Sequence, residues 1–93
     1  MKKEQHPHCL LRVRGMRDTL NRMEQQVADY VLEHPREVVR LTIDELANRA
    51  ETSYATVTRF CKRTGFSGYK QFRDALVREV LGEPPAEGAE RTE

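Results

Sequence analysis

The 93-residue sequence has no tryptophan, three phenylalanines, three tyrosines and two cysteines. It also lacks a long apolar run, which excludes a membrane-spanning helix. Its positively charged start has no apolar stretch typical of a signal peptide, so we expect a cytoplasmic protein. Cys9 and Cys61 lie far apart, one near the terminus and one in a helical pattern. We therefore expect both to be reduced thiols.

Catalytic and metal-binding signatures are missing as well. The sequence shows no pair of carboxylates, no His/Cys dyad and no glycine-rich phosphate loop, and a chain this short leaves little room for a pocket. His6, His8 and Cys9 are potential zinc ligands, but no fourth ligand accompanies them. We therefore expect neither an enzyme nor a cofactor or metal site.

Acidic residues are absent from one long stretch, residues 52–73, although Asp and Glu number 15 in the whole chain. The basic residues within this stretch are Arg59, Lys62, Arg63, Lys70 and Arg73. A formal net charge of +1 says little about partners, but a local excess of positive charge is what phosphate binding requires.

What is present is helical periodicity without any alternating strand pattern. The sequence predicts an all-α, compact bundle of about five helices in a domain spanning residues 9–82. Residues 1–8 are polar and predicted to be a flexible N-terminus. Residues 83–93, which are rich in proline and glutamate, are predicted to be a disordered tail or the start of a linker.

The first half of the domain contains clear helix boundaries. Residues 9–18 have helical spacing, weakened by one glycine. Asn21 and Glu24 form a capping box that starts a second helix. The apolar stripe predicted for this helix is Met23, Val27, Tyr30 and Val31. Pro35 ends the second helix and can begin a short third one.

The second half begins with two short helices separated by a tight turn. Thr42 and Glu45 form another capping box, which starts a helix at about 43–50, and Ser53 caps a helix at about 53–64. The residues predicted to pack these helices together are Ala47, Val57, Phe60 and Cys61. These dimensions are typical of a helix-turn-helix of the homeodomain-like type, whose second helix enters the major groove of DNA.

A further helix is predicted after this motif. Gly65 is a natural residue to end the helix at about 53–64. Ser67 is predicted to cap the next helix, which ends at Gly82. Its apolar stripe consists of Tyr69, Phe72, Leu76 and Val80. Because the aromatic residues lie on this stripe and on that of the earlier helix, we expect them to be core residues rather than platforms for nucleic-acid bases.

The outward face of the helix at about 53–64 suits duplex DNA. Arg59 can bond bidentately to guanine, and the methyl group of Ala55 can contact thymine. The residues predicted to read bases are Tyr54, Ala55, Thr58, Arg59 and Lys62. Those predicted to contact phosphates are Thr42, Ser53, Thr56, Arg63, Lys70 and Arg73. Acidic side chains on this face would be repelled by a polyanion.

The stretch "SYATVTRFCKRTGFSGYKQFRDAL" resembles the N-terminal helix-turn-helix domain of the RpiR family of bacterial transcription regulators. The matching residues are Leu46, Ala47, Ser53, Ala55, Thr56, Val57, Arg59, Phe60, Lys62, Gly65, Phe66, Gly68, Tyr69, Phe72 and Leu76. The resemblance extends over roughly residues 10–81. Glu51 stands in the turn where glycine is frequent, and Thr52 stands where a small apolar residue such as valine is usual.

The resemblance implies a regulator that binds double-stranded operator DNA, with a palindromic operator, as a homodimer or higher oligomer. It also implies control of sugar-metabolism genes. In this family a phosphosugar effector binds to a C-terminal domain that is absent from this chain, and the final residues resemble a cut linker, so we interpret the chain as a fragment.

Two alternatives remain at this stage. The segment "SYATVTRF" also resembles the recognition helix of lactose-repressor-like regulators, although those place it at the extreme N-terminus. A helix-turn-helix module could instead bind an acidic protein partner through its basic face. Binding to duplex DNA at physiological salt distinguishes the last alternative from the other two.

Overall fold

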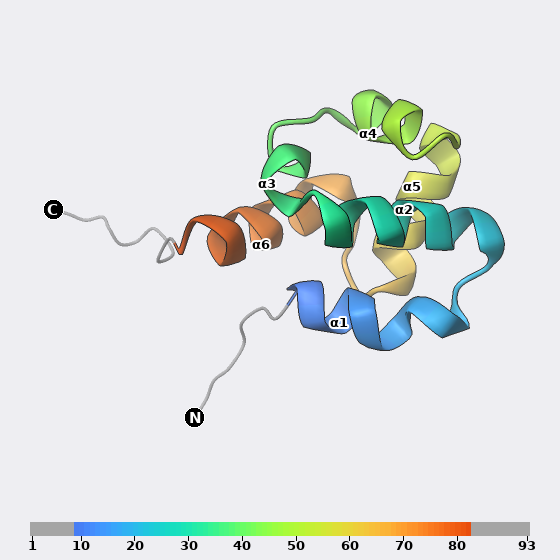
Figure 1. Cartoon of the computed structure of the whole chain (residues 1–93), viewed down its shortest axis with the longest axis horizontal. Coiled ribbons are helices and arrows are strands. Elements are labelled where there is room, and N and C mark those ends of the chain that lie inside the picture. Colours follow the sequence, from blue (N-terminus) through green and yellow to red (C-terminus); the bar gives the residue numbers. More distant parts are fainter. Residues whose placement is uncertain (1–8, 83–93) are drawn as a thin grey trace, which may run out of the picture.

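A computed structural model describes residues 9–82, which fold into helices joined by short connections (Figure 1). The helices are α1 (Cys9–Met16), the 3-10 helix η1 (Arg17–Thr19), α2 (Arg22–Glu33), α3 (Pro35–Val38), α4 (Ile43–Arg49), α5 (Tyr54–Arg63) and α6 (Tyr69–Leu81). This range contains no strand, which confirms the all-α prediction. The six α-helices of this range agree with the five or so expected, and they include the short helix that Pro35 was predicted to begin.

Several sequence predictions concern residues outside this range. The flexible N-terminus, the proline-rich tail, and His6 and His8 all lie outside the described residues. Within residues 9–82, no helix is long and apolar enough to cross a membrane. The same residues contain no group of three or more potential metal ligands.

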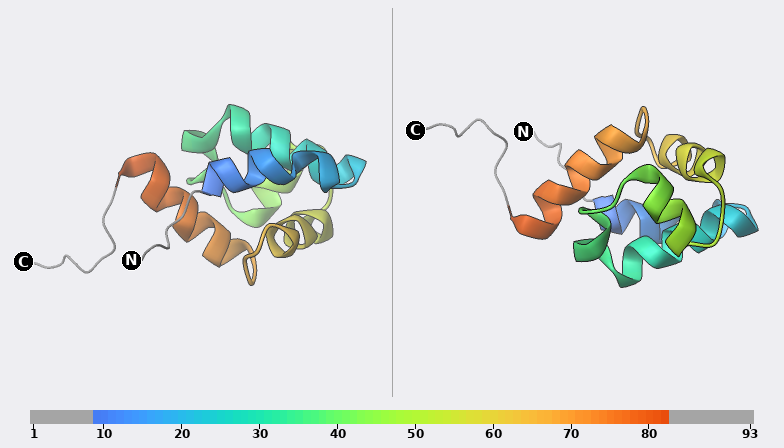
Figure 2. Two further views of the ribbon diagram at one scale, coloured as in Figure 1. Left: turned by 90° about the horizontal axis from the view of Figure 1, so that it is seen from below. Right: turned by 90° about the horizontal axis from the view of Figure 1, so that it is seen from above.

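The helices pack in an arrangement that places α5 at one side of the bundle. α1 and α2 run side by side, and α5 packs mainly against α2 and α4 (Figures 1 and 2). α6 leaves the end of α5 and packs against α1, α3 and α5. α5 is therefore held by its two neighbours in sequence, α4 and α6, and by the more distant α2.

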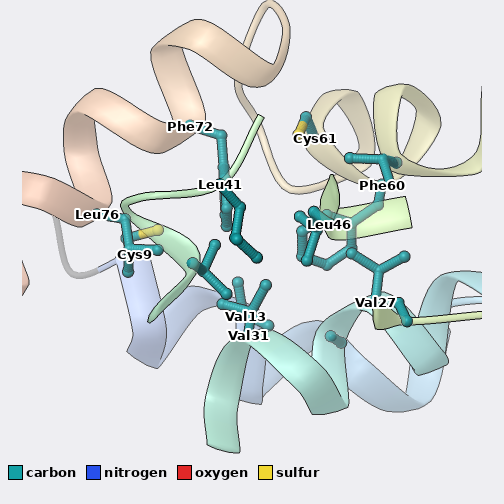
Figure 3. Packing of buried hydrophobic residues seen from close by; sticks show 14 of the residues in the cluster. Cys9, Val13, Val27, Val31, Leu41, Leu46, Phe60, Cys61, Phe72 and Leu76 are labelled. Carbon is teal, nitrogen blue, oxygen red and sulfur yellow. The ribbon is translucent and has the colours of Figure 1, made fainter. Parts of the chain in front are cut away.

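The core collects side chains from all the main helices. Val57, Phe60 and Cys61 of α5 are fully buried, as their spacing predicted. They meet side chains from α1, α2 and α6 (Figure 3). Phe72 of α6 packs edge-to-face against Phe60, with ring centroids 5.4 Å apart. The inner side of α5 is thus anchored in the centre of the domain.

Both cysteines belong to this core. Cys9 and Cys61 are free and buried, as the sequence predicted. Burial raises the pKa of each thiol to about 12. Because the thiolate is the nucleophilic form, both side chains behave as small apolar residues at neutral pH.

The two predicted capping boxes are present. The Glu24 amide donates to Asn21 Oδ1 at 2.9 Å, and the Asn21 amide donates to Glu24 Oε1 at 3.2 Å. The equivalent distances between Thr42 and Glu45 are 3.1 and 2.9 Å. Since each box satisfies two unpaired N–H groups, α2 and α4 begin where local sequence dictates.

Two details of the helix predictions are wrong. Met23 is 40% exposed and does not belong to the buried stripe of α2. The buried positions of α2 begin at Glu24 and continue with Val27, so Met23 lies beside the stripe. Ser67 does not cap α6: the N-cap is Gly68, whose carbonyl accepts from the Phe72 amide at 3.1 Å.

Candidate nucleic-acid interface

The helix-turn-helix predicted from capping signals is present over residues 43–63. α4 and α5 begin and end within one residue of the predicted boundaries. In the turn between them, the Glu51 amide donates to Asn48 O at 3.0 Å and the Thr52 amide to Ala47 O at 2.9 Å. This Schellman motif places Glu51 in the left-handed conformation, with φ of 59°. A residue that usually avoids positive φ therefore forms the turn that aims α5.

A side chain from α2 holds the turn from the other side. Gln26 Nε2 donates to the carbonyl of Ala50 at 2.8 Å and to that of Glu51 at 3.3 Å. These carbonyls lie at the end of α4, where no intrahelical donor is available. Sequence reasoning missed this contact, because Gln26 precedes the turn by 24 residues and carries no local signal.

The N-terminus of α5 is capped by the predicted residue. Ser53 Oγ accepts from the Thr56 amide at 3.1 Å. The hydroxyls of Ser53 and Thr56 are also 3.1 Å apart, and Thr56 is only 4% exposed. Ser53 lies at the surface, whereas the Thr56 side chain is part of the cap. The predicted phosphate contact of Thr56 therefore lacks an accessible hydroxyl.

The remaining predicted site residues lie at or near the surface. The base-reading candidates Tyr54, Ala55, Arg59 and Lys62 are exposed and Thr58 is half-buried. Among the phosphate candidates, Thr42, Arg63 and Lys70 are exposed and Arg73 is half-buried. Tyr54 is 58% exposed at the start of α5, in contrast to the other aromatic residues, which contribute to the core. α5 itself presents no carboxylate on this face.

One buried carboxylate nevertheless contacts the basic side chains of α5. Glu24 of α2 is fully buried, and its Oε2 accepts from Arg63 Nε at 3.1 Å. Arg59 Nε lies 3.9 Å from the same oxygen. The sequence suggested that acids stay away from the recognition helix. The structure shows that α2 supplies one from behind it.

The C-terminus of α5 ends in a second Schellman motif. The Phe66 amide donates to Cys61 O at 2.9 Å, and Gly65 takes the positive φ of 98°, as expected for a helix stop. Arg12 of α1 donates to Thr64 O at 2.9 Å. Its guanidinium also lies 5.4 Å from the centre of the Phe66 ring. A cation here complements the negative end of the helix.

A shallow groove of about 310 Å³ lies beside the start of α6. Its lining residues are Arg40, Leu41, Thr42, Tyr69, Lys70 and Arg73. Three predicted phosphate contacts thus meet in one groove, and Arg40 is a fourth basic or polar residue that sequence reasoning missed. Tyr69 Oη donates to Leu41 O at 2.7 Å and ties α6 to the opposite wall. Burial raises the pKa of Tyr69 to about 12, so it remains a donor at neutral pH.

Residues 8–82 match the family described as "Helix-turn-helix domain, rpiR family". The chain belongs to this family. Its rpiR domain is 39% identical over 74 residues to the bifunctional protein glk of Paraburkholderia xenovorans, a match that covers 80% of this chain and 12% of that protein. It is 35% identical over 73 residues to the HTH-type transcriptional regulator HexR of Pseudomonas aeruginosa, covering 78% and 26% of the two chains.

Two solved structures share the fold. The N-terminal domain of ybbH from Bacillus subtilis matches with a TM-score of 0.74 and 29% identity over 77% of this chain and 88% of that one. NanR of Vibrio vulnificus, solved in complex with ManNAc-6P, matches with a TM-score of 0.78 and 37% identity. That match covers 82% of this chain and 29% of NanR.

The rpiR chain spans about an eighth of glk and a quarter of HexR, and in both the matching part is the helix-turn-helix domain. The matched part of the chain is therefore a helix-turn-helix domain of the kind found in the transcriptional regulator HexR, not an enzyme domain. The alternative of a lactose-repressor-like regulator is wrong, because residues 8–82 match the rpiR family and the motif follows helices α1, α2 and α3 rather than lying at the extreme N-terminus.

Proposed function

We propose that this domain binds operator DNA with α5 in the major groove, as part of a regulator of sugar-metabolism genes. The observation that supports the proposal best is the outer face of α5. It is exposed and basic, it carries no acid, and contacts from α1, α2 and α4 hold its helix at both ends. A rigid helix with such a face meets the requirements for reading base edges.

The exposed residues divide into two roles by their place on the surface. Tyr54, Ala55 and Arg59 lie towards the N-terminal part of α5, the part that approaches bases in this motif. Thr58 and Lys62 continue the same face. Ser53 and Arg63 at the ends of α5 would contact the backbone, together with the groove formed by Thr42, Lys70 and Arg73. Arg40 would add a phosphate contact in that groove.

The wider properties of the regulator follow from its relatives and belong to the proposal. We infer a homodimer or higher oligomer on a palindromic operator, acting in the cytoplasm of a bacterium. HexR is a transcriptional regulator, and NanR was solved in complex with ManNAc-6P, a phosphorylated sugar. A phosphosugar effector would act through a domain outside the part that matches here.

Selection of bound duplexes from a random pool tests the proposal directly. A recovered palindrome would support sequence reading by a two-fold symmetric assembly, and its half-site spacing would constrain the dimer. With about five phosphate contacts per protomer, a plot of the logarithm of the association constant for DNA against the logarithm of the salt concentration should have a slope of about −4 to −5 per half-site. Retention of no duplex at physiological salt would overturn the proposal and favour an acidic protein partner.

The role of Arg59 can be separated from its charge. Arg59→Ala should cost about 1–3 kcal/mol on the selected operator and much less on random DNA. Arg78→Ala removes the same charge from an exposed position near the end of α6 and serves as the matched control. Equal losses on both duplexes would make Arg59 a phosphate contact rather than a base reader.

A further inference from the structure

Glu24 of α2 lies directly behind the recognition helix and has no role in the local fold that requires its charge. We propose that it is a positioning residue for Arg63 and Arg59, and that it limits the sequence-independent affinity of α5 for DNA. This inference rests on the proposed DNA-binding function. It concerns the balance between operator and non-operator binding, which neither the fold nor the family match specifies.

The first argument is geometric. Both oxygens of Glu24 have partners: Oε1 accepts from the Asn21 amide at 3.2 Å and Oε2 from Arg63 Nε at 3.1 Å. The residue is fully buried, while the side chains of Arg63 and Arg59 are 55% and 58% exposed. The carboxylate therefore holds the inner edge of Arg63 and leaves its outer N–H groups at the surface.

The second argument is a comparison with Glu45, which occupies the same position in the other capping box. Glu45 makes the same pair of cap contacts with Thr42. It is exposed, and no ion pair involves it within residues 9–82. The cap thus requires neither burial nor an arginine partner. The contacts of Glu24 with α5 are an addition to the capping box.

The third argument concerns charge. A buried carboxylate without compensation is costly, so Glu24 needs the two arginines. They in turn share one internal negative charge, which offsets part of the attraction that they would exert on phosphates. Arg59, whose Nη2 also lies 3.4 Å from Thr56 Oγ1, is held close to the helix surface. Guanidinium groups held in this way can contact DNA in one fixed orientation, which disfavours contacts with the phosphates of an arbitrary duplex.

Glu24→Gln tests the proposal, because the glutamine oxygen can still accept from the Asn21 amide, whereas its NH2 group replaces the oxygen that accepts from Arg63 Nε, so the charge and that hydrogen bond are lost together. We expect the affinity of the variant for non-operator duplex to rise roughly three- to tenfold. The slope of log association constant against log salt concentration should become steeper by about 0.9, the value for one additional neutralised phosphate. Operator affinity should change less, so the specificity ratio falls. Glu45→Gln is the matched control and should leave that ratio unchanged.

A merely structural role would give a different result. If Glu24 only stabilises the fold, Glu24→Gln lowers the melting temperature and weakens both duplexes by the same factor, which would overturn the proposal. A double-mutant cycle adds a second criterion: in an Arg63→Gln background, Glu24→Gln should have less effect on the ratio. An unchanged effect there would contradict action through Arg63.

One readout does not involve DNA. Nuclear magnetic resonance of the free domain should show slow exchange of the Arg63 Nε proton, and Glu24→Gln should accelerate it at least severalfold. Equal exchange rates would overturn the positioning role even if DNA binding is confirmed. Failure of the wild-type domain to bind any duplex, with the Nε proton protected, would instead contradict the proposed function alone.

Discussion

The two ends of the helix-turn-helix offer a comparison within one molecule. The turn before α5 and the turn after it are both Schellman motifs, with the same pattern of amide-to-carbonyl hydrogen bonds. The residue at positive φ is Glu51 in the first and Gly65 in the second. The buried hydroxyl of Thr52 has no partner in the described part of the chain, whereas that of Thr64 donates to Phe60 O at 2.9 Å.

The two turns therefore differ in backbone strain, in the hydrogen bonding of a buried hydroxyl and in the side chain that supports them. The turn after α5 has the residue that its backbone prefers, a satisfied hydroxyl and a cation from α1. The turn before α5 has a strained residue and an unsatisfied hydroxyl, and it depends on Gln26 from α2. The orientation of α5 is therefore set by the turn that has a non-glycine residue at positive φ and a buried hydroxyl without a partner among the described residues.

The largest effect is expected from Gly65→Ala in the more stable turn. A side chain at φ of 98° is strained, and the added Cβ would lie 2.5 Å from Arg12 Nη1. We expect a loss of about 2–3 kcal/mol in the free energy of unfolding from the strain and the displaced contact. Urea denaturation measures it. Gly15→Ala is the control, since its Cβ would meet nothing within 4 Å.

Arg12→Met should have the next largest effect, because it removes the cation from the end of α5 and keeps an apolar stem. We expect a loss of about 1–1.5 kcal/mol from the hydrogen bond to Thr64 O and the interaction with the helix dipole. Arg14→Met, which changes an exposed residue of the same helix, provides the control. Equal melting temperatures for the two variants would show that the Arg12 contact contributes nothing.

Replacing threonine by valine should raise the free energy of unfolding in one turn and lower it in the other. Thr52→Val removes an unsatisfied buried hydroxyl and should stabilise the domain by about 1 kcal/mol. Thr64→Val leaves the carbonyls of Phe60 and Cys61 without their hydroxyl donor and should destabilise it by a similar amount. Thermal unfolding of both variants is the measurement, and a change of the same sign in both would refute the comparison.

The smallest effect is expected from Glu51→Gly. Glycine relieves the cost of positive φ but adds conformational entropy to the unfolded chain, so the net stabilisation should be about 0.5–1 kcal/mol. Glu51→Ala keeps a Cβ and should leave stability near that of the wild type. Urea denaturation of the pair tests whether backbone strain, rather than the carboxylate, distinguishes this turn.

Local chemistry explains which features were predictable from sequence. Asn21, Thr42 and Ser53 cap helices through contacts three residues away, so sequence spacing is enough to find them. The same applies to Gly65, which the following turn requires. Met23 was misplaced because periodicity alone does not show where a stripe ends.

Long-range polar contacts could not be predicted in this way. Arg12, Gln26 and Glu24 act on α5 or its turn across 52, 24 and 39 residues. Nothing in the local sequence distinguishes Arg12 or Gln26 from an ordinary surface residue, and the capping box that identifies Glu24 does not indicate its contact with Arg63. The fold follows from caps and apolar periodicity, whereas the orientation of the candidate site depends on these three side chains.

The contact between Arg12 and Thr64 also bears on how the domain folds. The hydrogen bond to Thr64 O at the C-terminus of α5 forms only once α1 has docked, although its two residues lie 52 positions apart in the sequence. We therefore expect α5 to be less stable in residues 42–66 alone than in the whole domain. Since Arg12 is synthesised long before Thr64, the donor is already available when the recognition helix leaves the ribosome.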